Sequence, residues 1–173
     1  MKGVIAVCLG DLVKEKFGKD KWDKCLEHAG LPKTTFFLPT GNVDDAAVLK
    51  VVDSVCKVLN ITLNQAADAF GDYWVNVYAP KIYKSYYRDK KTAKEFLSAM
   101  DQVHKTVTET IAGAKPPRFD YELQGDKVMI MKYNSHRGLI DFFIGLLKGV
   151  GRYFNEKLTI TALGGDKVKI VFP

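Results

Sequence analysis

The stretch Arg118–Gly138, RFDYELQGDKVMIMKYNSHRG, decides the fold that we expect, because it has the pattern of two strands joined by a turn. Large side chains occupy alternate positions in both strands: Phe119, Tyr121 and Leu123, then Val128, Ile130 and Lys132. The segment Gln124–Asp126 between them contains Gly125, which is typical of a hairpin turn. The sequence therefore predicts an antiparallel hairpin in the second half of the chain.

Helices are predicted before this hairpin, and one further helix and a second hairpin after it. The upstream helices are expected at residues 2–17, 19–29, 44–59, 62–78 and 91–111. The later elements are an amphipathic helix at 138–154 and strands at 158–162 and 168–172. This order predicts an α+β fold for a single domain, 1–173, with an N-terminal helical lobe (1–60) and a second lobe (61–173) that contains the sheet.

Composition narrows the class of protein. The chain has 173 residues, of which 47% are hydrophobic, and this is enough for a real core. Cys8, Cys25 and Cys56 are an odd number of cysteines, so we expect a reducing cytoplasm rather than a disulfide framework. No apolar run reaches the roughly 18 to 20 residues of a membrane span, so we expect a soluble protein without membrane insertion.

A net charge of +6 and a pI near 9.1 raise the question of nucleic-acid binding. The basic stretch Lys81–Lys94 interleaves its cations with Tyr83, Tyr86 and Tyr87, and stacking combined with charge could hold single strands. Acidic residues are nevertheless spread through the chain, and no nucleic-acid motif is present. We therefore favour a solvated helix end and loop for this stretch, and expect no nucleic-acid partner.

His104 lies on the apolar stripe of the helix predicted at 91–111. The stripe has spacings of three and four residues: Leu97, Met100, His104, Val107 and Ile111. An imidazole on a buried face needs a hydrogen-bond partner or a metal, and the spacing leaves both interpretations open. His28 and His136 are weaker candidates, and no pair of histidines or cysteines has the spacing of a zinc site.

Tyr133, Ser135 and Arg137 follow one another at period two where the second strand should end. Alternate side chains of an extended backbone share a face, so a phenol, a hydroxyl and a guanidinium point the same way. Because the planar guanidinium matches a carboxylate, the pattern indicates an anion clamp, with an ordinary polar surface strand as the alternative. A single imidazole on an apolar face suits haem, whose porphyrin supplies four nitrogens. The two haem propionates would then be the anions in the clamp.

Six segments carry a wider resemblance: Met1-Lys-Gly3, Ala69-Phe-Gly-Asp-Tyr-Trp74, Met100-Asp-Gln-Val-His104, Gly113-Ala-Lys-Pro-Pro-Arg118, Tyr133-x-Ser-x-Arg137 and Gly145-Leu-Leu-Lys-Gly149. In order and spacing, the chain resembles the haem nitric oxide/oxygen-binding (H-NOX) domains related to the sensor domain of soluble guanylate cyclase. The resemblance implies an α+β fold in which an N-terminal helical lobe, further helices and a small antiparallel sheet enclose haem b, iron protoporphyrin IX.

The same resemblance implies a role for individual residues. His104 would be the proximal iron ligand, and Tyr133, Ser135 and Arg137 would hold the propionates. Pro117 matches the proline that presses on the porphyrin in this family and distorts it. The distal wall would be drawn from six residues: Ile5, Leu9, Trp74, Tyr78, Phe142 and Leu146.

Ligand choice depends on that distal wall. Family members that hold O2 stably have a distal tyrosine that donates a hydrogen bond to it, and Phe142, which has no donor, aligns with that position. We therefore expect nitric oxide and carbon monoxide to bind the ferrous iron, with O2 excluded. Tyr78 and Trp74 carry O–H and N–H groups, so an O2-binding domain is one alternative. A haem-free module that binds a small acid or nucleic acid is another.

The resemblance also implies a gas sensor that relays a conformational change. Gas binding would weaken the bond between the iron and His104 and shift the N-terminal helices against the rest of the chain. The implied partner is a histidine kinase, a cyclic-di-GMP enzyme or a chemotaxis receptor. No enzymatic activity is expected, because none of the predicted distal residues is the acid–base group that a haem peroxidase needs.

Overall fold

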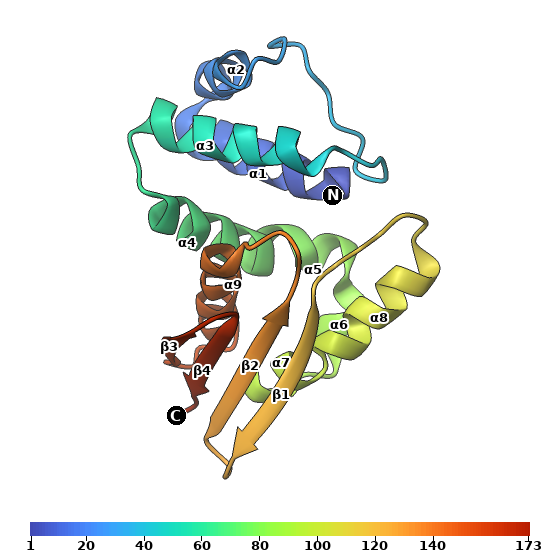
Figure 1. The fold of residues 1–173 in the computed structure, drawn as a ribbon, viewed down its shortest axis with the longest axis vertical. Coiled ribbons are helices and arrows are strands. Elements are labelled where there is room, and N and C mark those ends of the chain that lie inside the picture. The colour runs from blue at the N-terminus through green and yellow to red at the C-terminus, as the bar shows by residue number, and fades with distance from the viewer. The chain divides into compact units, whose positions relative to one another are not determined.

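The computed structural model of the protein describes residues 1–173, which form two compact units, Met1–Ala66 and Ala67–Pro173. The first unit contains helices, and the second contains helices and a sheet (Figure 1). The predicted α+β class is therefore confirmed. The sequence predicted lobes that meet at residues 60/61 within one haem-binding domain, and that domain assignment stays a prediction. No helix is both long enough and apolar enough to cross a membrane.

Three helices form the first unit at the predicted places: α1 (Gly3–Phe17), α2 (Lys19–His28) and α3 (Asp45–Leu59). Asp44 caps α3, because its side chain accepts a hydrogen bond from the backbone N–H of Ala47 at 3.1 Å. Ser54 is buried in this unit, and its hydroxyl lies 3.0 Å from Nδ1 of His28. His28 thus satisfies a buried polar group, which is a structural role.

The second unit contains most of α4 and all the later helices. Their bounds are α4 (Leu63–Tyr73), the π-helix η1 (Trp74–Tyr78), α5 (Ala79–Ile82), α6 (Lys84–Arg88), α7 (Ala93–Ser98), α8 (Met100–Thr110) and α9 (Ile140–Tyr153). The predicted helix at 138–154 corresponds to α9. Two short helices, α5 and α6, occupy the stretch that was expected to be mainly a loop.

The helix predicted at 91–111 is in fact two helices, and a tyrosine from the sheet explains the break. In a continuous helix, the N–H of Asp101 would donate to the carbonyl of Leu97. Instead, the hydroxyl of Tyr121 accepts from the Asp101 N–H at 2.9 Å and donates to the Leu97 carbonyl at 3.0 Å. A side chain inserted into the backbone ladder in this way ends α7 and redirects the chain into α8.

The helix predicted at 62–78 changes to a π-helix over its last turn. Pro80 has no N–H to donate to the carbonyl of Asn76, and its ring would clash with that carbonyl in a regular α-helix. The wider π turn, in which the Ala79 N–H bonds to the Trp74 carbonyl, accommodates the proline. The side-chain amide of Asn76 then donates to the Gly149 carbonyl of α9 at 3.2 Å, which anchors η1 to that helix.

One antiparallel sheet contains all four strands, in the order β1-β2-β4-β3. The strands are β1 (Arg118–Gln124), β2 (Val128–Asn134), β3 (Thr159–Gly164) and β4 (Lys167–Val171). Both hairpins are where the sequence predicted them. The pairing of β2 with β4, which joins them, was not predicted, because nothing local in either hairpin indicates it.

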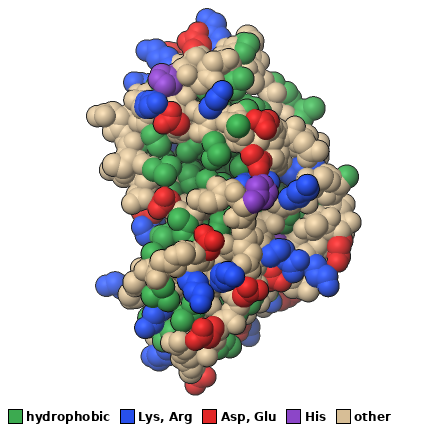
Figure 2. All heavy atoms as spheres, viewed as in Figure 1, with side chains coloured by type: hydrophobic (Ala, Val, Ile, Leu, Met, Phe, Trp, Pro, Cys, Tyr) green, Lys and Arg blue, Asp and Glu red, His purple; other side chains and the backbone are tan.

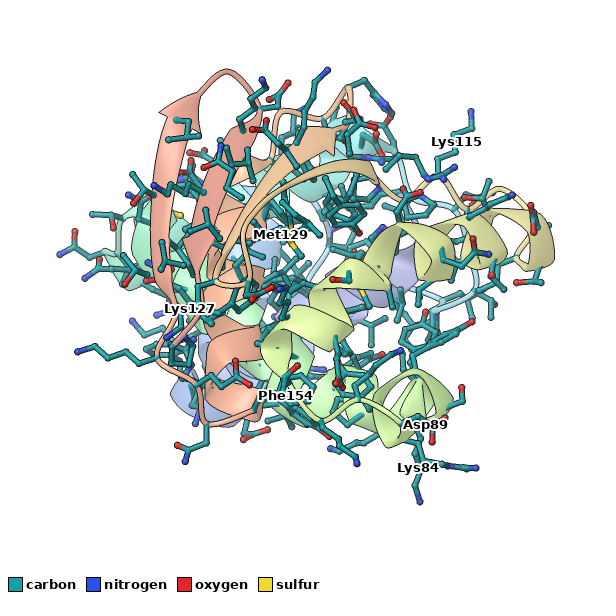
Figure 3. The ribbon with its side chains drawn as sticks, turned by 90° about the horizontal axis from the view of Figure 1, so that it is seen from below. Lys84, Asp89, Lys115, Lys127, Met129 and Phe154 are labelled. Atoms are coloured by element: carbon teal, nitrogen blue, oxygen red, sulfur yellow. The ribbon has the colours of Figure 1, made fainter.

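The core of the second unit lies on one face of this sheet. Along β2 the buried alternate positions are Met129, Met131 and Tyr133, so Val128, Ile130 and Lys132 face the other way. Figure 3 shows Met129 directed into the interior. The sheet face packs against aromatic and aliphatic side chains of α7 and α9: Phe96, Leu97, Phe143, Leu147 and Val150. This core positions the end of β2, which carries the predicted clamp.

Candidate functional site

His104 on α8 has one ring nitrogen engaged and the other without a hydrogen-bond partner. Its Nδ1 lies 2.7 Å from the carbonyl oxygen of Pro117. A carbonyl can only accept, so Nδ1 must carry the proton of the neutral imidazole, and Nε2 must carry the lone pair. A backbone carbonyl bonded to one nitrogen is the usual arrangement that fixes the other nitrogen as a metal ligand.

The surroundings of His104 keep its imidazole neutral. The side chain is half-buried, and burial lowers the pKa of His104 below its ordinary value of 6.5. The hydrogen bond to Pro117 and the negative charge of Asp101 raise the pKa, but by less than burial lowers it. At neutral pH, Nε2 therefore has its lone pair available to bind a metal.

Asp101 and Arg118 tie α8 to β1, a contact that the sequence reasoning missed. The guanidinium of Arg118 donates from Nε and Nη2 to the two carboxylate oxygens of Asp101, at 2.7 and 2.6 Å, and Phe119 N–H adds a third bond at 2.9 Å. The bidentate bond from Arg118 lowers the pKa of Asp101 to about 2. Asp101 stands three residues before His104, so the two share a helix face. That spacing is the signal that could have identified it.

Of the three predicted clamp residues, Tyr133 lies on β2, whereas Ser135 follows the end of that strand and Arg137 lies in a turn, so the extended run expected through Arg137 is not present. Tyr133 is buried and hydrogen-bonded to Ser135, and Arg137 is close enough for its charge to act on the phenol. Burial raises the pKa of Tyr133, while Ser135 and Arg137 pull it down. Nη1 of Arg137 also donates to the Lys115 carbonyl at 2.7 Å, although the Lys115 side chain itself points outward (Figure 3). The clamp is thereby connected to the segment that leads to Pro117.

Aromatic rings connect the clamp to the histidine. The ring of Phe119 lies 5.3 Å from that of His104 and 5.2 Å from that of Phe143, measured between ring centroids. Tyr133 stacks on Phe143 at 5.3 Å. Together they form an apolar wall beside the imidazole, and the polar clamp stands at its end. This combination suits a large planar ligand that has an apolar body and an anionic edge.

Four of the predicted distal residues lie on η1 and α9. Trp74 and Tyr78 are stacked, with ring centroids 5.6 Å apart, and the ring of Phe70 lies 6.0 Å from Trp74. Phe142 meets Phe70 edge-on at 5.5 Å. Leu146, one turn further along α9, packs against the same core. Phe70 therefore connects the two helices, and the sequence reasoning did not name it.

Glycines bring α4 and α9 into direct backbone contact. A Cβ atom on Gly71 would clash with the backbone of Gly145, and one on Gly145 would clash with the carbonyl of Ala67. Gly149 meets the carbonyl of Gly71 in the same way. Two ion pairs, Lys148 with Asp68 and Arg152 with Asp72, flank this crossing. The segment Gly145–Gly149, found as part of a family motif, thus sets the separation of the two helices.

Ile5 and Leu9 lie on α1 in the first unit, where Ile5 is half-buried and Leu9 is buried. Their part in a distal wall stays a prediction. His136 is exposed, and no three His, Cys, Asp or Glu side chains gather to form a metal site. A metal at Nε2 of His104 would therefore take its other ligands from a cofactor. The donor set of one imidazole, an apolar wall and a cationic clamp fits haem.

Comparison with known proteins also indicates a domain that binds haem. The family model described as haem-NO-binding matches residues 2–162. Two soluble guanylate cyclases of Caenorhabditis elegans, gcy-32 and gcy-34, are each 25% identical to this chain over 169 residues, which is 95% of the chain. The chain spans only about a quarter of the length of these cyclases, 25% in both cases.

Solved structures share the fold over nearly the whole chain. The crystal structure of an oxygen-binding H-NOX domain, in its oxygen complex, superposes with a TM-score of 0.85 at 26% identity, and covers 99% of this chain and 95% of that one. An H-NOX structure described as giving insight into the mechanism of H-NOX activation has a TM-score of 0.88 at 26% identity, with coverages of 99% and 96%.

Proposed function

Since the chain belongs to the haem-NO-binding family, we propose that it is a cytoplasmic gas sensor that binds nitric oxide and carbon monoxide, excludes O2 and does no catalysis. The observation that carries the proposal is the hydrogen bonding of the two ring nitrogens of His104. Its Nδ1 is bonded to the Pro117 carbonyl, and its Nε2 is left as a free electron-pair donor. This is the chemistry required of a proximal iron ligand.

We assign the haem-holding residues from the contacts described above. His104 would ligate the iron, and the clamp of Tyr133, Ser135 and Arg137 would hold the propionates. Pro117 would contact the porphyrin with its ring while its carbonyl orients His104. When bound, haem b supplies the ferrous iron on which the gas binds. The protein would supply the imidazole nitrogen that binds the iron, the apolar enclosure and the countercharge of the propionates.

Exclusion of O2 is proposed from the chemistry of the distal side chains. Bound O2 becomes polarised and is stabilised by a hydrogen-bond donor, whereas nitric oxide needs none. Phe142 and Leu146 on α9 have no donor to offer. The alternative is an O2-binding domain, and it is favoured by the similarity to an oxygen-binding H-NOX domain and by the donors of Trp74 and Tyr78.

The relay is proposed to begin at α8. Asp101 and Tyr121 bind α8 to β1 through both side-chain and backbone groups, so a displacement of His104 must be transmitted to the sheet or must break these bonds. The two states of such an element would be biased by the gas. The receiver is proposed to be a separate signalling protein such as a histidine kinase, a cyclic-di-GMP enzyme or a chemotaxis receptor.

An absorption spectrum of the dithionite-reduced protein tests the proposal. We expect the Soret band of five-coordinate ferrous haem, shifted by carbon monoxide and by nitric oxide but unchanged in air. A long-lived change in air would favour the O2-binding alternative, and Tyr78→Phe and Trp74→Phe would then identify the donor. A colourless protein that takes up no added haem would contradict both the nitric oxide sensor and the O2-binding alternative.

His104→Gly tests the axial ligand directly. This variant should lose most of its haem, and free imidazole should restore binding because it replaces the missing ring. His136→Gly is the matched control, since His136 is exposed, and it should keep haem without imidazole. Equal haem content in the two variants would show that His104 is not the ligand.

A further inference from the structure

A cavity of about 710 Å³ opens on the second unit, and none of the residues assigned to haem lines it. Four cations line it: Lys81 of α5, Lys84 and Arg88 of α6, and Lys90 just beyond α6. No aspartate or glutamate lines the cavity, and none of the proposed haem ligands or clamp residues does. The cavity is therefore a separate, basic feature of this unit.

The four cations have no counter-ion within the protein. None of them forms an ion pair, whereas Lys148 and Arg152 on α9 are paired with Asp68 and Asp72. Asp89 follows α6 but does not line the cavity, and Figure 3 shows it with Lys84 at the outer edge of the unit. Over the face drawn in Figure 2, basic and acidic side chains are interspersed. A hollow lined by one sign of charge raises the local concentration of anions.

The rest of the lining is aromatic or apolar, apart from Asn76. Tyr153 of α9 is 38% exposed, and its ring meets that of Tyr87 edge-on, with centroids 4.9 Å apart. Tyr87 also lines the cavity but is only 8% exposed, so it offers less ring surface than Tyr153 does. Val77 and Pro80 add apolar surface. An exposed phenol ring beside cations can stack on a planar base while the cations bind phosphates.

We propose that this cavity binds a nucleoside di- or triphosphate. The phosphate chain would contact Lys81, Lys84, Arg88 and Lys90, and the base would lie against Tyr153. A volume of about 710 Å³ falls within the range of roughly 300 to 1,000 Å³ that is usual for sites of small organic ligands. Guanidinium and ammonium groups are the usual protein partners of phosphate oxygens.

The surroundings favour a single nucleotide over a nucleic-acid strand. A strand needs several exposed rings in a row, on which successive bases stack. Tyr83 and Tyr86, which share the basic stretch, instead pack towards the core, where the ring of Tyr83 contacts Trp74 and Tyr86. Tyr153 is therefore the one well-exposed ring at the cavity, since Tyr87 is only 8% exposed, and this suits one base.

Calorimetric titration of the haem-loaded protein with ATP, without added metal and at about 150 mM salt, tests the phosphate contacts. We expect saturable binding, and we expect Lys84→Gln/Arg88→Gln to weaken it by about tenfold or more. Lys127→Gln/Lys132→Gln removes the same amount of charge from exposed positions outside the cavity and should leave the affinity for ATP unchanged. No saturable binding, or equal loss in both double variants, overturns the proposal.

Tyr153→Leu tests the base contact, because it removes the ring from an exposed position. We expect it to weaken ATP binding while inorganic tripolyphosphate binds as before. If tripolyphosphate binds the native protein as tightly as ATP does, or if an oligoglutamate peptide binds more tightly, the assignment to a nucleotide is wrong. The haem spectrum of each variant, which should equal that of the native protein, keeps this test separate from that of the haem site.

Discussion

Polar contacts fix the proximal region of the second unit, whereas close packing fixes its distal region. The proximal region comprises α8, β1 and the end of β2, and its residues are held by hydrogen bonds from His104 to Pro117, from Arg118 to Asp101 and from Arg137 to Lys115. The distal region comprises α4, η1 and α9, where glycines and stacked rings set the geometry. Neighbouring groups or water can compensate for the loss of one hydrogen bond. Two helices whose backbones are in contact, by contrast, leave no space for a larger side chain between them. The two regions should therefore respond differently to substitution.

The largest effect is expected from Gly145→Val in the distal region. The new side chain would press on the carbonyl of Ala67, and because that atom is backbone, α4 and α9 would have to separate. We expect a loss of more than about 3 kcal/mol in the free energy of unfolding, measured by urea denaturation. Ala162→Val on β3, where residue 162 is exposed, is the control and should change stability little. A native-like Gly145→Val protein would show that the crossing is more tolerant than its geometry indicates.

Arg137→Gln should have the next largest effect, on haem retention rather than on folding. It removes the charge expected to hold a propionate, and it also removes the donor to the Lys115 carbonyl. A hydrogen bond between charged groups contributes about 1.5 to 3 kcal/mol, so haem should transfer to an excess of apo-globin at least about tenfold faster. Lys132→Gln removes a neighbouring exposed charge from β2 and should not alter the rate. Equal rates in the two variants would argue against the clamp.

The sequence predicted these two regions unequally, and the reason is physical. Tyr133, Ser135 and Arg137 lie within five residues of one another, so their period-two spacing was visible in the sequence, although β2 ends at Asn134 and Arg137 lies in a turn. The place of His104 on its helix follows in the same way from the helical repeat. Local periodicity was therefore enough to identify the clamp and the histidine as candidates.

Contacts between distant segments were not predictable in this way. The break between α7 and α8 depends on Tyr121, which lies 20 residues after Asp101. The contact of Gly71 with Gly145 and the pairing of β2 with β4 likewise join parts of the chain that no local pattern relates. The basic cavity needs Tyr153 to meet α5 and α6, although the basic stretch itself was visible as Lys81–Lys94.

Asp101→Asn tests whether the proximal region remains stable after the loss of one of its polar contacts. The pKa of Asp101 is about 2, below its ordinary 3.8, so its stabilisation is fully present above pH 3.8 and is lost as pH falls towards about 2. At neutral pH, we expect the substitution to cost about 1 to 2 kcal/mol, less than the pKa shift alone implies, because water screens the half-exposed pair. Asp120→Asn, at an exposed site on β1, the strand that carries Arg118, is the control for urea denaturation. If Asp101→Asn lowered the free energy of unfolding as much as Gly145→Val does, the proximal and distal regions would not differ in their tolerance of substitution.

Phe142→Tyr should have the smallest effect on stability and yet change the ligand that the protein accepts. Phe142 meets Phe70 edge-on and is only half-buried, so the added hydroxyl has room without disturbing the helix crossing. One new hydrogen bond to O2 is worth about 0.5 to 1.5 kcal/mol, so the affinity for O2 should rise by up to about tenfold, while carbon monoxide and nitric oxide binding change little. Phe142→Leu, which adds no donor, is the control for altered packing. If neither variant binds O2 more tightly than the native protein does, Phe142 does not face the gas, and Trp74 or Tyr78 on η1 must control ligand choice instead.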